Sequence, residues 1–195
     1  MHVIVVGAGE VGHSIASSLA QPHDVIVVEQ NDAVVEALTN SLDVLFIHGD
    51  GTNLNTLHKA GISQADLVIA CTNNDETNII VCGTTKTVSD AFTIARVRKR
   101  ILFNTWRRSQ NSFDVDYMIC SDLLTAQAIA RIAGIPATRD VDTFAGGLIQ
   151  MAEFEIEESS PIGNQTVNEA DQYDSLTFAA IFRANEMEVA TGETV

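Results

Sequence analysis

Several kinds of residue are scarce in this 195-residue chain, and each scarcity excludes a class of protein. With only 3 prolines and 12 glycines, the chain is neither collagen-like nor a Pro/Gly-rich disordered segment. The 3 cysteines, Cys71, Cys82 and Cys120, form no Cys-x-x-Cys pair, which argues against structural zinc and a disulfide framework. No apolar run reaches the roughly 18 residues of a membrane span. The N-terminus lacks the basic segment of a secretion signal, so we expect a cytoplasmic protein.

Basic residues are also scarce, with 11 Lys and Arg against 26 Asp and Glu and a net charge of -15. Such a chain is a poor partner for nucleic acid, which we exclude. Acidic excess also suits a salty cytoplasm, where ions screen self-repulsion, and it predicts a melting temperature that rises with salt. Residues 140–195 hold 12 of the acids and one base, Arg183. This shift in charge predicts two domains, residues 1–135 and 136–195.

What the chain has in abundance is apolar material, 46% of its residues, arranged in short runs that alternate with helical patterns. Six runs predict strands: residues 3–6, 25–28, 43–47, 65–70, 91–95 and 116–119. Helices are expected over about 10–19, from 31 or 32, over 52–60, after 76, and from 121 or 122 to 134. Continuously apolar strands separated by helices predict a doubly wound α/β fold with a parallel sheet covered on both faces. Beyond residue 140, apolar and polar residues alternate over 149–156 and 176–182, which predicts the half-exposed strands of a small α+β unit.

A glycine-rich loop links the first expected strand to the first expected helix. It reads Gly7-Ala8-Gly9-Glu10-Val11-Gly12. In a G-x-G-x-x-G loop the first glycine permits a tight turn, the second lets a pyrophosphate approach the backbone, and the third lets helix and strand pack closely. The helix N-terminus offers free N–H donors and a positive dipole end to phosphates. This placement predicts a nucleotide site; the alternative is a purely structural glycine turn.

Acidic and polar residues follow the next strands. Glu29 ends the second strand, where a carboxylate would accept hydrogen bonds from ribose hydroxyls and repel a 2′-phosphate, which favours NAD(H) or another adenine nucleotide over NADP. Asp50, Thr72 and Asn73 follow the third and fourth strands at the same edge and could contact the adenosine. Asp50 and Asn73 are explained equally well as turn residues, because both types bond their own backbone. Glu10 disfavours a triphosphate, or simply complements the helix dipole.

The sequence offers no evident proton carrier for a dehydrogenase. Tyr117 and Tyr173 have no lysine four residues later, and His13 and His48 have no partner near them in the chain. No Walker lysine, nucleophile elbow or paired metal ligands are present. We therefore expect a protein that binds a nucleotide without acting on it. The alternative from another class is a small NAD-dependent oxidoreductase that uses His13 or His48.

Taken together, these motifs are similar to one known family. The matching segments are VIVVGAGEVG (3–12), VIVVEQND (25–32), HGDGTN (48–53), ADLVIACTNNDETNI (65–79) and TIARVR (93–98). They resemble the regulator-of-potassium-conductance (RCK) family, and within it the TrkA-type subunit of Trk potassium uptake systems, with DETN as the most specific element. Residues 118–156 resemble the family's linker helix and the opening of its C-terminal subdomain. Because such subdomains usually continue further, the second domain is expected to be incomplete.

The resemblance implies a Rossmann-like lobe that pairs with its neighbours in a homo-oligomeric ring beneath a membrane potassium transporter and changes shape with the bound nucleotide. Carried over by position, the nucleotide-binding residues would be Gly7, Ala8, Gly9, Glu10, Val11, Gly12, Glu29, Gln30, Asp50, Gly51, Thr72, Asn73, Asn74 and Arg96. Arg96 is expected near ligand phosphates or at a subunit contact. Glu10 stands where some family members have an arginine suited to triphosphates, which favours NAD or NADH, with ATP or ADP as runner-up. A third alternative is a lobe that assembles without binding any ligand.

Two further features follow from this comparison. Ser121-Asp122 replaces the family's frequent Pro-Glu pair, so we expect helix capping there rather than a cation site. Six of the 11 bases fall within residues 96–108. They suit a contact with another subunit or with the transporter, which Trp106 between them supports, or else a solvated face that balances local acids.

Overall fold

We describe the fold from a computed structural model of the chain. It describes residues 1–39, 42–109, 113–134, 138–144, 149–157, 159–171, 177–183 and 186–194. These residues form two compact units, Met1–Gln127 and Ala128–Val195. The division falls inside one helix, and the expected domain boundary at residue 135 stays a prediction. None of the described helices combines the length and the apolar character that crossing a membrane requires.

The first unit is built on a six-stranded sheet in which all neighbours pair in parallel. The strands are β1 (His2–Val6), β2 (Asp24–Glu29), β3 (Leu45–His48), β4 (Leu67–Ala70), β5 (Phe92–Val97) and β6 (Tyr117–Cys120). Their order across the sheet is β3-β2-β1-β4-β5-β6. The chain therefore winds outward in both directions from β1 and β4, and the crevice at the carboxyl ends of these two strands is where such folds bind ligands. The predicted doubly wound α/β fold is confirmed.

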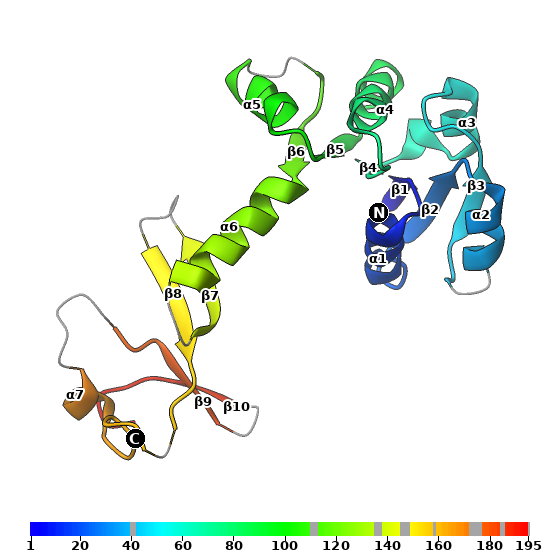
Figure 1. The fold of residues 1–195 in the computed structure, drawn as a ribbon. Helices are drawn as coiled ribbons and strands as arrows, with labels where there is room; N and C mark the ends of the chain where they lie inside the picture. Colours follow the sequence, from blue (N-terminus) through cyan, green and yellow to red (C-terminus); the bar gives the residue numbers. More distant parts are fainter. Residues whose placement is uncertain are drawn as a thin grey trace. The chain divides into compact units, whose positions relative to one another are not determined.

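Helices cover both faces of this sheet (Figure 1). They are α1 (Glu10–Leu19), α2 (Asp32–Thr39), α3 (Leu54–Lys59), α4 (Asp75–Val88) and α5 (Arg100–Arg108), with a short 3-10 turn at Ile62–Gln64. A further helix, α6 (Ser121–Gly134), follows β6 and leads away from the sheet (Figure 1). Val3 and Val5 of β1 pack in one layer with residues of α1 and α2. Ile4 and Val6 pack in the other with residues of α3, α4 and α5. Burial on both faces explains why β1 and β2 are continuously apolar.

The structure corrects the sequence-based elements at several places. β3 begins at Leu45 and β4 at Leu67, each two residues later than expected. The basic window contains a helix, α5, that periodicity did not predict. Phe103 and Trp106 of α5 pack against the core, and the Trp106 ring N–H donates to the carbonyl of Val115 at 2.8 Å. Phe103 and Trp106 lie three positions apart and share one helix face, so the helical pattern was present in the sequence although arginines surround it.

The start and the apolar side of α6 also differ from expectation. Ser121 is already the first residue of α6, and the hydrogen bond described for its hydroxyl goes to Asp122 at 3.3 Å, so neither residue shows the expected cap. The residues expected on the apolar side of this helix are largely exposed, with Leu124 at 53%, Ile129 at 62% and Ile132 at 52%. An exposed apolar face of this kind is typical of an interaction surface.

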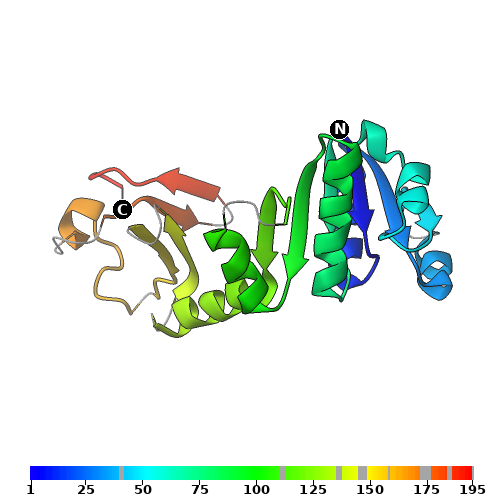
Figure 2. The same cartoon turned by 90° about the horizontal axis from the view of Figure 1, so that it is seen from above.

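The second unit contains two antiparallel strand pairs and a short helix. β7 (Thr138–Phe144) pairs with β8 (Ile149–Phe154), and β9 (Ala180–Arg183) pairs with β10 (Glu186–Val189); they are yellow and orange to red in Figure 2. α7 (Val167–Ala170) begins with a capping box between Thr166 and Glu169. The expected α+β character is confirmed. The strand expected over 176–182 begins only at Ala180, and residues 172–176 lie outside the described part.

All three cysteines are buried, as expected, and none forms a disulfide. Cys71 is 4%, Cys82 0% and Cys120 2% exposed. Burial raises the pKa of the Cys82 thiol to about 12. These cysteines are small apolar core residues.

Candidate functional site

Two of the three loop glycines are required by the fold itself. Gly7 has a φ of +102°, a conformation that side chains rarely adopt, and a Cβ there would lie 2.9 Å from backbone atoms of Thr72. A Cβ on Gly12 would lie 1.9 Å from the carbonyl oxygen of Gly7. Gly7 therefore makes the turn between β1 and α1, and Gly12 lets α1 pack against that turn. The Gly7 N–H donates to the Val28 carbonyl at 2.8 Å, which ties the turn to β2.

Gly9 differs from both. Its backbone is ordinary, with φ -63° and ψ -177°, and a Cβ there would have no protein atom within 4 Å. Nothing in the described chain therefore requires glycine at this position. Gly9 is the N-cap of α1 and no side chain caps the helix, so free N–H donors lie beside this open space. The loop has the shape of a cradle for an anion.

Glu29 is held against the loop by backbone hydrogen bonds. Its Oε2 accepts from the Ala8 N–H at 2.7 Å and its Oε1 accepts from the Asn31 N–H at 2.8 Å. Each carboxylate oxygen has a second acceptor position, which remains for ribose hydroxyls. The carboxylate thus holds the glycine loop through the Ala8 N–H and is also a candidate ligand for ribose hydroxyls.

The residues beside Glu29 are arranged by turns and strand ends. The Gln30 carbonyl lies 3.1 Å from Nε2 of His48, which also lies 3.2 Å from Oδ1 of Asp32. Asp50 Oδ1 accepts from both the N–H and the hydroxyl of Thr52, each at 2.8 Å. The structure therefore shows a turn role for Asp50, while its contact with adenosine stays a prediction. Gly51 is buried, and a Cβ on it would lie 2.3 Å from the Val6 side chain.

A buried amide connects the ends of β4 and β5. Asn78 Oδ1 accepts from the Thr72 N–H at 2.8 Å and from the Thr72 hydroxyl at 2.6 Å. Its Nδ2 donates to the carbonyl of Thr72 at 3.1 Å and to that of Arg96 at 2.7 Å. Thr72, which backs onto Gly7, and Arg96 are in this way fixed relative to one another. Asn74 is the N-cap of α4, with its Oδ1 accepting from the Thr77 N–H at 2.7 Å.

Arg96 has a side chain that the described chain does not fully satisfy. Its Nε is buried and has no hydrogen-bond partner among the described residues. The charge of Arg96 acts on the thiol of Cys71. The Cys71 N–H donates to the Val6 carbonyl at 2.9 Å, so Cys71 lies where β1 and β4 end. Burial raises the pKa of the Cys71 thiol to about 11, while the Arg96 charge lowers it and the Glu29 charge raises it. The charges of Arg96 and Glu29 therefore both influence the Cys71 thiol, which lies where the strand order reverses.

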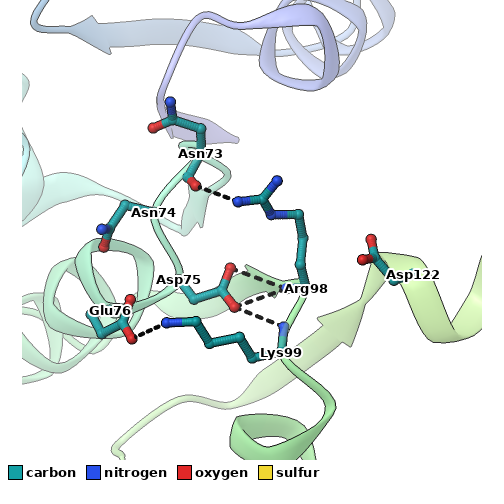
Figure 3. A pocket seen from close by; sticks show the side chains of 7 residues that line it. All are labelled: Asn73, Asn74, Asp75, Glu76, Arg98, Lys99 and Asp122. Atoms are coloured by element: carbon teal, nitrogen blue, oxygen red, sulfur yellow. Dashed lines mark hydrogen bonds and ion pairs between the residues drawn. The ribbon is translucent and has the colours of Figure 1, made fainter.

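A hollow of about 320 Å³ lies beside this point, at the carboxyl ends of β4, β5 and β6 (Figure 3). It is lined by Asn73, Asn74, Asp75, Glu76, Arg98, Lys99 and Asp122. Its two cations have partners: an Arg98 Nη2 donates to the Asn73 carbonyl at 3.2 Å, and Lys99 Nζ pairs with Glu76 at 2.5 Å. The Lys99 hydrogen bond lowers the pKa of Glu76, and the same contact raises that of Lys99. The hollow thus carries no free excess of positive charge.

The predicted residues fall into two groups. Hydrogen bonds and close backbone contacts join the glycine loop, Glu29, Thr72 and Arg96 into one continuous arrangement. Glu10 and Val11 are exposed on the first turn of α1, and Asn73 lies in the hollow. Asp75 and Asn78 were not among the predicted site residues, although both belong to the DETN element. The available signal was two polar residues three positions apart, which share one helix face.

Asp75 is 4% exposed, and its carboxylate accepts from backbone N–H groups at the end of β5. Arg98 donates at 3.0 and 3.1 Å and Lys99 at 2.8 Å. This carboxylate joins the N-terminus of α4 to the start of α5. Within the part of the chain that the structure describes, no three His, Cys, Asp or Glu side chains gather as metal ligands would.

Comparison with known proteins identifies the family. Residues 3–118 match the model of the TrkA-N domain. The chain is 34% identical, over all 195 of its residues, to the Trk system potassium uptake protein TrkA homolog of Archaeoglobus fulgidus, of which it covers 44%. It is 34% identical to the Trk system potassium uptake protein TrkA homolog 2 of Methanosarcina mazei, with 99% of this chain and 44% of that protein covered. The chain thus spans less than half the length of these relatives.

Solved structures share the fold. The GsuK channel bound to NAD aligns with a TM-score of 0.68 and 19% identity, over 100% of this chain and 35% of that one. GsuK bound to ADP aligns with a TM-score of 0.57 and 17% identity, over 67% of this chain and 34% of that one. The family match spans more than half of the sequence and agrees with the order of the strands and the place of the glycine loop. The chain therefore belongs to the TrkA-N domain family.

Proposed function

We propose that this chain is a nucleotide-sensing regulatory subunit of a potassium uptake transporter, and that it binds NAD(H) or another adenine nucleotide. The observation that carries the proposal is Gly9, a glycine that the fold does not require and that opens onto free space at the N-terminus of α1. Membership of the TrkA-N family supports the link to potassium uptake. The NAD and ADP in two structures of similar fold support the ligand class.

Each part of the site has a chemical task in this proposal. The loop from Gly7 to Gly12 and the first turn of α1 donate N–H groups to the phosphates. Arg96 supplies a charge-assisted hydrogen bond to a phosphate oxygen, which would satisfy its buried Nε. Glu29 accepts from the ribose hydroxyls. Asp50, Thr72 and Asn73 face the adenosine side of the same edge.

The charges favour a dinucleotide or a diphosphate. Glu29 repels a 2′-phosphate, which favours NAD(H) over NADP. Glu10, exposed in the first turn of α1, disfavours the added charge of a triphosphate. NAD or NADH is therefore the first choice, and ADP or ATP the second.

Regulation then follows from assembly. A ligand shifts a protein between two states only if it binds them unequally, so the signal must reach a second surface. We propose that copies of the lobe pair with one another beneath a Trk-type membrane transporter, at the cytoplasmic face. The exposed Leu124, Ile129 and Ile132 of α6 support such pairing, because apolar side chains exposed in one chain are buried in an assembly.

We further propose that the chain does no chemistry on the nucleotide. His48, a candidate proton carrier, pairs across the β2–β3 ladder with Glu29 and contacts Gln30 and Asp32. These contacts support a position beside the proposed ribose rather than a role as proton carrier. Sustained NADH oxidation with small carbonyl substrates, lost in His13→Ala or in His48→Ala, would replace this proposal by the oxidoreductase.

The test is calorimetric binding of NAD+, NADH, ADP and ATP in high-potassium buffer. The wild-type chain is compared with Glu29→Ala, and with Glu36→Gln, which alters an exposed carboxylate of α2, as the control. We expect saturable binding of NAD(H) that weakens at least roughly tenfold, a loss of about 1.4 kcal/mol, in Glu29→Ala and is unchanged in Glu36→Gln. Folded wild-type chain that binds none of the four would overturn the proposal and leave a lobe that only assembles.

A further inference from the structure

We infer that Asn78 is a positioning residue for the phosphate end of the nucleotide site, which it serves by holding Arg96 in register with the glycine loop. This inference rests on the proposed nucleotide binding. Asn78 is 0% exposed, so it cannot touch a bound ligand through solvent-accessible surface. Whatever it contributes to binding passes through the residues it holds.

The amide of Asn78 uses all of its ordinary bonding capacity on two residues. Both donors and both acceptor positions are engaged, three times with Thr72 and once with Arg96. Asn78 lies on the second turn of α4, while Thr72 follows β4 and Arg96 lies in β5. One side chain therefore fixes three separate segments at the edge of the sheet.

Through Thr72, the hydrogen bonds of Asn78 connect to the glycine loop. Gly7 has no room for a Cβ because Thr72 Cα and N lie only 2.9 Å from where it would stand. The backbone of Thr72 thus packs directly against Gly7 at the first turn of the loop. The Asn78 hydrogen bonds to the N–H and carbonyl of Thr72, at 2.8 and 3.1 Å, hold this backbone in place.

Through Arg96, the hydrogen bonds of Asn78 connect to the candidate phosphate ligand. Asn78 Nδ2 donates to the Arg96 carbonyl at 2.7 Å, and the Nε of the same arginine is buried without a partner among the described residues. A buried donor left unsatisfied carries a desolvation cost. Because Arg96 as a whole is only partly buried, a turn of its guanidinium toward the loop would let a phosphate oxygen remove that cost. The distance from Arg96 to that oxygen depends on where Asn78 holds its backbone.

A purely structural role for Asn78 makes a different prediction. If the amide only satisfied buried polar groups, its loss would lower stability and weaken the binding of all ligands alike. If Asn78 positions Arg96, the loss of Asn78 should weaken only the binding of ligands that carry phosphates. This effect should disappear when the Arg96 guanidinium is absent. The comparison of ADP with adenosine isolates the phosphates, and a double-mutant cycle with Arg96 isolates the coupling.

The experiment measures ADP and adenosine affinity for the wild-type chain, Asn78→Asp, Asn78→Ala, Arg96→Gln and the Asn78→Asp/Arg96→Gln double variant. Asn78→Asp keeps the two acceptor bonds to Thr72 and loses the donor bonds to the carbonyls of Thr72 and Arg96. Asn78→Ala, which brings no new charge, serves if the aspartate variant does not fold. Thr85→Val is the matched control. Thr85 is also 0% exposed and on α4, and its hydroxyl bonds only the Val81 carbonyl, at 2.8 Å.

We expect the preference for ADP over adenosine to fall roughly tenfold in the Asn78 variants, which corresponds to about 1.4 kcal/mol, with adenosine affinity unchanged. In the Arg96→Gln background the Asn78 substitution should have no further effect, and Thr85→Val should leave the preference intact. Equal losses for both ligands, or fully additive effects in the double variant, would overturn the inference. Wild-type chain that binds none of NAD+, NADH, ADP and ATP would refute the proposed function, and that result is seen before any substitution is made. If the wild-type chain binds NAD+ and not ADP, NAD+ replaces ADP in the comparison.

Discussion

The three loop glycines give a prediction that separates the fold from the binding site. Replacing Gly9 by alanine adds a methyl group where no protein atom lies within 4 Å, on a backbone with φ -63°. The same change at Gly12 places the methyl group 1.9 Å from the Gly7 carbonyl oxygen. Gly9→Ala should therefore damage nucleotide binding but not folding, and Gly12→Ala should damage folding first.

The expected magnitudes follow from these contacts. In Gly9→Ala the reduced entropy of the unfolded chain stabilises by about 0.4–1 kcal/mol, and the weaker N-cap destabilises by a similar amount. The melting temperature should therefore stay within about 2 °C of wild type. In Gly12→Ala, overpacking against backbone costs about 1–3 kcal/mol, so the melting temperature should fall by about 4–10 °C.

Calorimetry with NAD+ and ADP, alongside thermal melts, tests both halves of the prediction. A methyl group at Gly9 keeps the pyrophosphate away from the loop N–H groups, so we expect NAD+ affinity to fall at least roughly tenfold. Gly9→Ala that melts like wild type and also binds NAD+ like wild type would refute the reasoning, because the open space beside Gly9 would then not be where the phosphates lie.

Three further predictions concern charge. In Glu29→Gln the preference for NAD+ over NADP+ should fall at least roughly tenfold in calorimetry, because the repulsion of the 2′-phosphate is lost; an unchanged preference would move the ribose elsewhere. Burial works to raise the pKa of Asp116, but hydrogen bonds from Lys86 and Thr93 outweigh it and keep that pKa below its usual value. A carboxyl with a depressed pKa stabilises the fold above its unfolded pKa of about 3.9, and this contribution is lost as the pH falls through the folded value. Urea unfolding between pH 5 and 3 should therefore show a smaller loss of stability in Asp116→Asn than in wild type, and equal losses would contradict this account. Burial raises the pKa of Cys71 to about 11 and that of Cys82 to about 12, so neither thiol should react with a disulfide reagent at pH 8 until the protein is unfolded, and rapid labelling of the native chain would argue against their burial.

The sequence predicted the first unit well where one physical signal dominated. β1 and β2 are runs of Val and Ile because both of their faces are covered, and burial of this kind is visible in any single sequence. The glycine loop was recognisable because its three glycines have the G-x-G-x-x-G spacing between a strand and a helix. Even here the sequence could not say which glycine the fold needs, since the 1.9 Å approach of Gly12 to Gly7 is a property of the packed structure.

The parts that escaped prediction depend on long-range contacts. α5 is a partial exception, because Phe103 and Trp106, three positions apart, mark one helix face in the sequence itself. Asn78 is a polar residue in a polar stretch, and only the meeting of β4, β5 and α4 shows that it is buried. α6 was predicted correctly as a helix, but its exposed Ile129 reveals that its apolar side has no cover within the described chain.

The state of the site in the structure also limits where a regulatory signal can arise. The Glu29 carboxylate already accepts two backbone N–H groups and the glycine loop is already formed, so these contacts offer a ligand much the same surface in any state that keeps the sheet intact. Contacts that are equal in two states raise affinity but shift nothing. Arg96 is different, because its buried Nε has no partner among the described residues and would gain one only if its guanidinium turned toward an acceptor. Under the proposed function we therefore expect Glu29 to decide which nucleotide binds, and Arg96, held by Asn78, to decide whether binding changes the protein.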